Sequence, residues 1–325
     1  KIHFPKHLES LKLYCKDNTK YVDSLPHTLK LFTLRCHKFN QPLNYLPCLT
    51  LLKIVCNKFN QPLDKLPETL QSLCIMGNKF NQSLECLPDS LCKLELHSEC
   101  FNLPLNKLPQ QLQSLKLYGC HIFNQPLNHL PNNLKLLEIS DCHDFNQPLN
   151  QLPNTLESLN LLLCYRLIQS LDNLPHNLKL LTINQCKQTI CNIDMLPSTI
   201  ETLAISNFID FTQDLAKLPP LIINLRIGSS TFTDPLCHLP NTLKSLDISC
   251  NSFNQNLDNL PNTLKSLTIW SHAFDQSLDN LPNTLQKLLV LSRKFDRSLN
   301  NLPNTIESVN IVKTGKSESY SILNL

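Results

Sequence analysis

The sequence predicts a solenoid, an elongated repeat protein in which about fifteen coils of 20–22 residues stack one on the next. The first observation behind this prediction is a Leu-Pro pair, once Phe-Pro, that recurs at this spacing along nearly the whole chain. The second is that apolar residues stand at fixed distances after each proline. The prolines of the repeat are Pro5, Pro26, Pro47, Pro67, Pro88, Pro109, Pro131, Pro153, Pro175, Pro197, Pro219, Pro240, Pro261, Pro282 and Pro303.

Each coil contains one short segment with the pattern of a β-strand. After Pro131, the apolar residues Leu134, Leu137 and Ile139 stand three, six and eight positions on, and Cys142 stands at eleven. This L-x-x-L-x-L-x-x-C spacing matches the leucine-rich repeat pattern. Its alternating part predicts a strand with every second side chain inside. The predicted fold class is therefore a leucine-rich-repeat-like solenoid with a parallel β-sheet on its concave face.

The other half of each coil carries the motif Phe-Asn-Gln-Pro-Leu, which occurs unchanged in four copies, from Phe39, Phe59, Phe123 and Phe145. The segment is short and rich in proline, which disfavours a long helix. We expect an extended or short-turn convex face with little helix. Phe145, Leu149 and Leu152 would close the core against the strand, while Asn and Gln bond backbone groups in the turns.

The unbroken period predicts one domain rather than several. We expect residues 1–312 to form a single solenoid. Residues 313–325 leave the repeat, and we expect them to form a C-terminal cap or, alternatively, a tail. A single coil buries too little apolar surface to fold alone, so its neighbours must contribute to its stability.

Composition argues against several functional classes. The net charge is +3 and the basic residues are scattered, so we expect no nucleic-acid binding. No run of eighteen apolar residues occurs, so no membrane span is expected. The four glycines cannot build a phosphate-binding loop of the Gly-rich type. No catalytic constellation stands out from the repeats, so we predict no enzyme activity, no catalytic residue and no cofactor.

The chain contains fifteen cysteines, and many follow the repeat. Those just after the expected strands are Cys15, Cys36, Cys56, Cys120, Cys142, Cys164, Cys186 and Cys250. We interpret them as a column of buried, reduced thiols, which favours an intracellular, cytoplasmic location. Metal binding is the alternative. There is no C-x-x-C motif, and adjacent residues such as Cys120 and His121 would point opposite ways, so no metal site is predicted.

Two columns of residues, seven and nine positions after each proline, should face outward from the strands. They vary in charge and size between coils, as a recognition surface would. The alternative is a solvated face under weak constraint. Trp270, Leu289, Leu291 and Val312 would form an apolar patch, and Tyr118 beside Lys116 offers an aromatic and a cationic anchor. The predicted partner-binding face consists of Arg35, Lys53, Met76, His97, Lys116, Tyr118, Glu138, Arg226, Asp247, Trp270, Leu289 and Leu291.

The Phe-Asn-Gln-Pro-Leu segments followed by Leu-Pro-x-x-Leu-x-x-Leu resemble FNIP repeats, a leucine-rich-repeat-like family of amoebae and giant DNA viruses. The resemblance covers residues 1–312, except that coils around Leu167, Thr189 and Ile209 lose the motif and are expected to be irregular. Some members of that family carry an N-terminal F-box that docks them onto a ubiquitin ligase. The chain begins at Lys1 inside a repeat, so an F-box would lie upstream of it.

The resemblance implies a non-enzymatic protein-protein interaction module that provides the substrate-recognition repeats of an F-box-type ubiquitin-ligase adaptor. The alternative is a structural component of a viral particle or another assembly. The expected partner is a protein on the concave face, and the expected location is the cytoplasm of the host cell, or the virion if the protein is viral.

Overall fold

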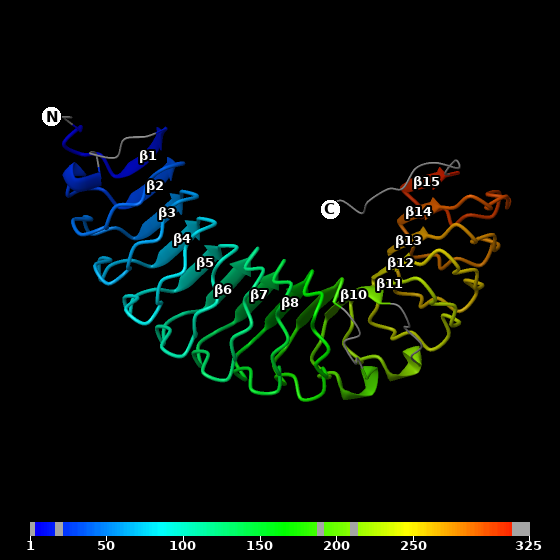
Figure 1. The fold of residues 1–325 in the computed structure, drawn as a ribbon. Coiled ribbons are helices and arrows are strands. Elements are labelled where there is room, and N and C mark those ends of the chain that lie inside the picture. The colour runs from blue at the N-terminus through cyan, green and yellow to red at the C-terminus, as the bar shows by residue number, and fades with distance from the viewer. Residues whose placement is uncertain (1–3, 17–21, 187–191, 209–213, 314–325) are drawn as a thin grey trace. The chain divides into compact units, whose positions relative to one another are not determined.

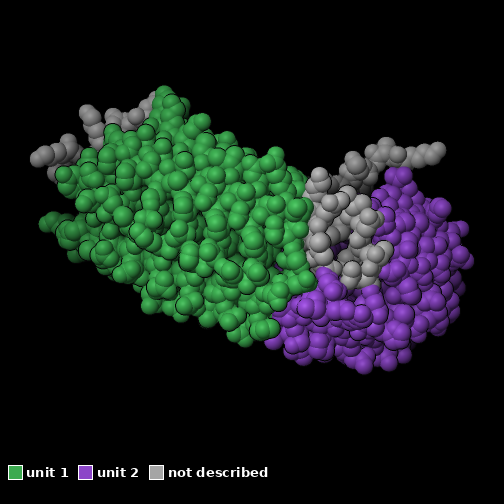
Figure 2. All heavy atoms as spheres, turned by 60° about the horizontal axis from the view of Figure 1, so that its bottom comes forward, with its two compact units in different colours: residues 1–180, 185–191 green, residues 181–184, 192–325 purple. Residues whose placement is uncertain are grey.

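The computed structural model describes residues 4–16, 22–186, 192–208 and 214–313. These residues form a leucine-rich-repeat-like parallel β-solenoid with one strand in each coil, which confirms the predicted fold class. Contacts divide the chain into two compact units, which Figure 2 shows in different colours. The first unit comprises residues 1–180 and 185–191, and the second comprises residues 181–184 and 192–325.

In the first unit, eight strands pair in chain order, all parallel and in register (Figure 1). They are β1 (Ser10–Cys15), β2 (Leu31–Cys36), β3 (Leu51–Val55), β4 (Ser72–Met76), β5 (Lys93–His97), β6 (Ser114–Tyr118), β7 (Leu136–Ser140) and β8 (Ser158–Leu162). Strand β9 (Leu180–Asn184) lies at the boundary of the two units.

In the second unit, strands β10 to β15 also pair in chain order and in parallel. They are β10 (Thr202–Phe208), β11 (Asn224–Ser229), β12 (Ser245–Ser249), β13 (Ser266–Trp270), β14 (Lys287–Leu291) and β15 (Ser308–Val312). The helices of the described residues are three single 3-10 turns, η1 (Val22–Ser24), η2 (Ile193–Met195) and η3 (Leu215–Lys217). The expectation of little helix is thus confirmed.

The core of each coil lies between the strand and the Phe-Asn-Gln-Pro-Leu segment. Alternate strand residues such as Leu115 and Leu117 are fully buried, and so is Phe145. The phenylalanines of successive coils stack at 5.7–6.4 Å between ring centroids in the first unit. In the coil after Pro153, buried Leu167 takes the place of the phenylalanine. The corresponding segments around Thr189 and Ile209 lie outside the described residues.

The Asn and Gln side chains of the repeated motif form a ladder of hydrogen bonds between coils. The side-chain oxygen of Asn60 accepts hydrogen bonds from the backbone N–H of Asn81 at 2.9 Å and from the amide of Gln82 at 3.0 Å. Asn102 accepts the same pair of bonds from Asn124 and Gln125. Each Asn therefore satisfies a backbone donor that the extended convex segment would leave unpaired, which explains why the motif repeats these two amides.

Coils of different length end their strands differently. In the 22-residue coils that follow Pro109, Pro131 and Pro153, an extra residue stands ten positions after the proline. These extra residues, Gly119, Asp141 and Leu163, all adopt a left-handed backbone with φ of 55–56°. The extra residue thereby bulges at the strand end, and the following cysteine returns to the core.

The predicted column of thiols is confirmed, with one correction. Seven of the eight cysteines are buried, but Cys15 is half-exposed, because among the described strands β1 pairs with β2 alone. The described cysteines are free thiols. Burial raises the pKa of Cys56 to about 12, so this thiol stays protonated near neutral pH.

The organisation of residues 1–312 as a single solenoid stays a prediction. Of the expected cap or tail, only Lys313 lies within the described residues. Its ammonium group pairs with Asp296 at 3.0 Å. Residues 314–325 lie outside the described part of the chain.

Candidate functional site

The outward face of the first unit carries a polar group on β6 and β7. The ammonium group of Lys116 lies 3.2 Å from the Glu138 carboxylate and 3.2 Å from the Tyr118 hydroxyl, and 5.8 Å from the centre of the Tyr118 ring. Burial lowers the pKa of Lys116, but hydrogen bonds to Tyr118 and Glu138 outweigh it and raise that pKa overall. The group is therefore a preorganised ion pair with a half-exposed aromatic ring beside it.

The other predicted residues of this unit follow in register along the same face. His97 on β5 is the partner of Tyr118 on β6, and Met76 on β4 is the partner of His97. Lys53 on β3 is half-buried, and Arg35 on β2 is exposed. The seven predicted residues of the first unit thus lie on neighbouring strands with their side chains facing outward.

The outward face of the second unit carries one ion pair and one apolar patch. Arg226 on β11 approaches Asp247 on β12 at 3.4 Å. Burial raises the pKa of the Asp247 carboxyl, and the Arg226 charge opposes that rise. The pair is half-exposed on both sides, so it contributes modestly to stability.

The apolar patch consists of Trp270, Leu289, Leu291 and Val312. The register aligns Trp270 with Leu291 and Leu291 with Val312 on consecutive strands, while Leu289 lies two residues before Leu291. Trp270, Leu289 and Leu291 are half-buried, and Val312 is 43% exposed. The buried indole Nε1 of Trp270 has no hydrogen-bond acceptor among the described residues.

The twelve predicted residues therefore fall into two groups on two units. The group of the first unit is charged and polar apart from Met76, and the group of the second combines an ion pair with apolar side chains. Their outward orientation follows from the strand alternation. Binding of a partner by either group stays a prediction.

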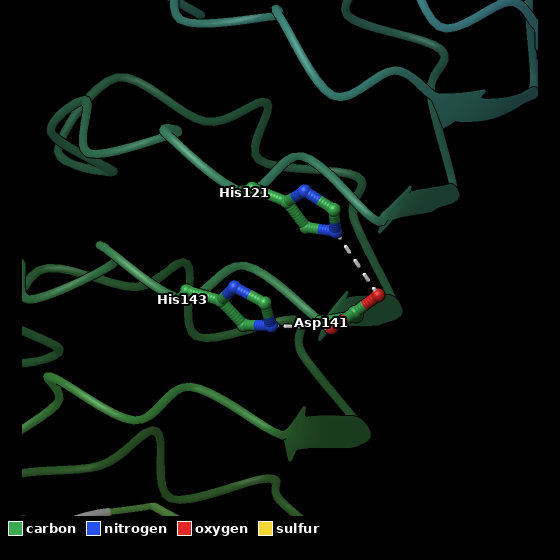
Figure 3. A group of neighbouring side chains, drawn as sticks. All are labelled: His121, Asp141 and His143. Atoms are coloured by element: carbon green, nitrogen blue, oxygen red, sulfur yellow. Dashed lines mark hydrogen bonds and ion pairs between the residues drawn. The ribbon is translucent and has the colours of Figure 1, made fainter.

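A third cluster, which sequence reasoning missed, lies just beyond the ends of β6 and β7 (Figure 3). The imidazole rings of His121 and His143 stack in parallel, with centroids 4.5 Å apart and 2° between their planes. The Asp141 carboxylate lies between their Nε2 atoms, with Oδ1 2.6 Å from His143 and Oδ2 3.3 Å from His121. In the described ranges, this is the one group of three potential metal ligands found together.

The signal for this cluster was present in the repeat spacing. His121 and His143 both stand twelve residues after their prolines, so they occupy the same place in consecutive coils. Asp141 is the extra residue of its 22-residue coil, and its left-handed backbone makes its carboxylate available to both rings. A repeat pattern that treats coils of 21 and 22 residues alike does not indicate where the extra residue, Asp141, lies.

No helix in the described part of the chain is long and apolar enough to cross a membrane.

Comparison with known proteins gives one family match. Residues 59–99 match the model of the FNIP repeat. No match was found among curated proteins.

The solved structures that resemble the chain include the following three. The first is CroV588, described as a novel circular leucine-rich-repeat protein, with 29% identity and a TM-score of 0.68 over 88% of this chain. YopM from Yersinia enterocolitica WA-314 is 20% identical, with a TM-score of 0.42 over 95% of this chain and 84% of that protein. A leucine-rich repeat protein from Bacteroides ovatus ATCC 8483 is 13% identical, with a TM-score of 0.25 over 79% of this chain and 85% of that one.

This chain spans about half the length of CroV588, 47% of it. The family match and this structural likeness confirm the resemblance proposed from the sequence. Residues 59–99 match the FNIP repeat, and the described chain folds as a leucine-rich-repeat-like solenoid.

Proposed function

We propose that this chain is a non-enzymatic interaction module that binds a protein partner with the outward faces of its strands. The leucine-rich-repeat-like fold is typical of protein-protein interaction modules, which supports this class of function. The observation that carries the proposal is the apolar patch of Trp270, Leu289, Leu291 and Val312. Contiguous apolar side chains that remain accessible on a strand face usually mark a contact site.

The chemistry of the patch indicates what it would bind. Tryptophan is among the residues most often found at energetic hot spots, and leucines around it can exclude water from the contact. The indole N–H of Trp270 lacks an acceptor among the described residues, and an unsatisfied buried donor costs about 1–3 kcal/mol. A partner that presents apolar side chains would cover the patch.

A pull-down from host-cell lysate tests this surface. We expect Trp270→Ala and Leu291→Ala to lose the partners that the wild-type chain retains. Ser140→Ala is the matched control, because Ser140 stands at the same outward repeat position, nine residues after Pro131, in the first unit. Circular dichroism would verify that each variant is folded. An unchanged set of partners across all variants would refute the assigned surface.

The finer proposal is that these repeats select the substrate of an F-box-type ubiquitin ligase in the cytoplasm. It rests on the family resemblance, and the free thiols of the described residues support a reducing compartment. Immunoprecipitation of the native protein from cells tests it, with recovery of a cullin as the expected result. Recovery of the protein in fixed stoichiometry within an assembled particle, without a cullin, would instead support the structural alternative.

A further inference from the structure

The cluster of His121, Asp141 and His143 is independent of the proposed partner-binding faces. Its three side chains come from two consecutive coils and converge at one point (Figure 3). The potential ligand atoms, one from each residue, all lie within 4.8 Å of one another. We propose that this cluster is a binding site for a divalent transition-metal cation, Zn²⁺ in particular, which clips the two coils together.

The donor set fits this cation. Zn²⁺ is bound by imidazole nitrogen and carboxylate oxygen, and sites with three protein ligands leave a fourth position for water or another ligand. Here the two Nε2 atoms and one carboxylate provide the three ligands. The side chains are 38–41% exposed, so a cation can enter from solvent and the fourth position stays open.

The scaffold holds the ligands in place before any cation binds. Strands β6 and β7 are paired in register through Tyr118 and Ser140. Just beyond them, the backbone N–H of Asp141 donates to the Leu162 carbonyl at 2.8 Å. The backbone N–H of Asp144 donates to the carbonyl of His121 at 2.9 Å. Binding a cation therefore requires rotation of side chains only, which limits its conformational cost.

The metal-free contacts show which atoms a cation would use. Each carboxylate oxygen of Asp141 lies within hydrogen-bond distance of one Nε2 atom. In the neutral rings, protons on Nε2 would make these contacts. A cation takes the place of both protons, so each ring must carry its proton on Nδ1 when the metal is bound. The adjacent Asp144 is engaged with Arg166 at 3.2 Å, which leaves Asp141 as the carboxylate for the site.

Neighbouring coils of the same length do not repeat this set. The residues that correspond to Asp141 are Gly119 and Leu163, which have no ligand atom in their side chains. Tyr165 takes the histidine position in the next coil, and its ring packs against His143 at 5.0 Å. The stack of rings thus continues while the ligands do not, and this confines the site to one place.

The test is a ZnCl₂ titration of the full chain followed by NMR of the imidazole nitrogens. Thiols also bind zinc, so uptake alone is insufficient and the signals of His121 and His143 are the readout. We expect both histidines to change together up to one equivalent of zinc. The variants are Asp141→Asn, which tolerates the left-handed backbone, and His143→Gln.

Both variants should weaken zinc binding at this site by roughly tenfold or more, since each loses one of three ligands. The matched control is His272→Ala. His272 corresponds to His121 and His143, but it lies in a coil of 21 residues that lacks the inserted residue. Its affinity should equal that of the wild type. Zinc uptake that leaves His121 and His143 unchanged would overturn the proposal, as would equal affinity in Asp141→Asn or the absence of uptake.

Discussion

The 22-residue coils after Pro109, Pro131 and Pro153 and the 21-residue coils after Pro240, Pro261 and Pro282 solve the same packing problem in two ways. In the shorter coils, Cys250, Ser271 and Ser292 follow the strand directly. The Cys250 thiol at 3.0 Å and the two hydroxyls at 2.7 Å each donate to the phenylalanine carbonyl of the preceding coil. In the longer coils, a left-handed residue is inserted first. The thiol of Cys142 then donates to two strand carbonyls, those of Ser140 at 3.5 Å and Leu117 at 3.8 Å.

The comparison shows that the strand pairing and the stacked phenylalanines are the same in both kinds of coil. The end of the strand, in contrast, accommodates one inserted residue. The core residues keep their register in both kinds of coil. The inserted residue differs between coils, with Gly119 buried and Asp141 and Leu163 half-buried. Asp141 shows the consequence, because an insertion that the core does not need brings a carboxylate to two histidines.

The largest expected effect tests whether the core is equivalent in the two kinds of coil. Phe123 in a 22-residue coil and Phe253 in a 21-residue coil are both fully buried between two stacked phenylalanines. We expect Phe123→Ala and Phe253→Ala each to lower the free energy of unfolding by about 3–5 kcal/mol. Urea titration measures the loss. Unequal losses, differing by more than the aromatic pair energy of about 1 kcal/mol, would show that the insertion alters the core.

Alkaline pH should distinguish coils with buried thiols from coils with serine. Burial raises the pKa of Cys56 to about 12 from the ordinary 9.0, and a hydrogen bond with Cys120 followed by burial raises that of Cys142. Because the folded pKa exceeds the unfolded one, this stability is complete below about pH 9 and is lost as the pH rises toward the folded value. Ionisation therefore favours the unfolded form of the thiol-containing coils.

The single tryptophan, Trp270, makes this comparison measurable, because it lies next to Ser271 in a serine-containing coil. Circular dichroism follows all strands, whereas Trp270 fluorescence follows its own region. As the pH is raised above about 9, the loss of dichroism should precede the change in fluorescence. Coincident transitions would contradict the expectation that the thiols are the weak point.

The smallest expected effect concerns the inserted residue itself. Leu163 adopts φ of 56°, a conformation that is strained for leucine and relaxed for glycine. Leu163→Gly should raise the free energy of unfolding by about 0.5–1 kcal/mol, as measured by urea titration. Ser249→Gly is the counterpart at the last strand residue of a 21-residue coil, where glycine should lower it by about 0.5–1 kcal/mol. Changes of the same sign would indicate that the left-handed residue is not specific to the longer coil.

Much of the fold was predictable because one period recurs. The distance from each proline identifies inward residues such as Leu137 and outward ones such as Glu138, and the strand alternation then determines their burial. The column of thiols followed from the same spacing. The exception was Cys15, whose strand β1 pairs with β2 alone among the described strands.

The sequence by itself determined the coil, its core positions and its outward columns, because these depend on local alternation within about 21 residues. Only the tertiary structure decided which side chains meet across coils, since that depends on register and on the backbone of single residues. It brought the Asp141 carboxylate between His121 and His143. The physical reason is that one left-handed residue redirects a side chain without changing the spacing of the apolar residues that define the repeat.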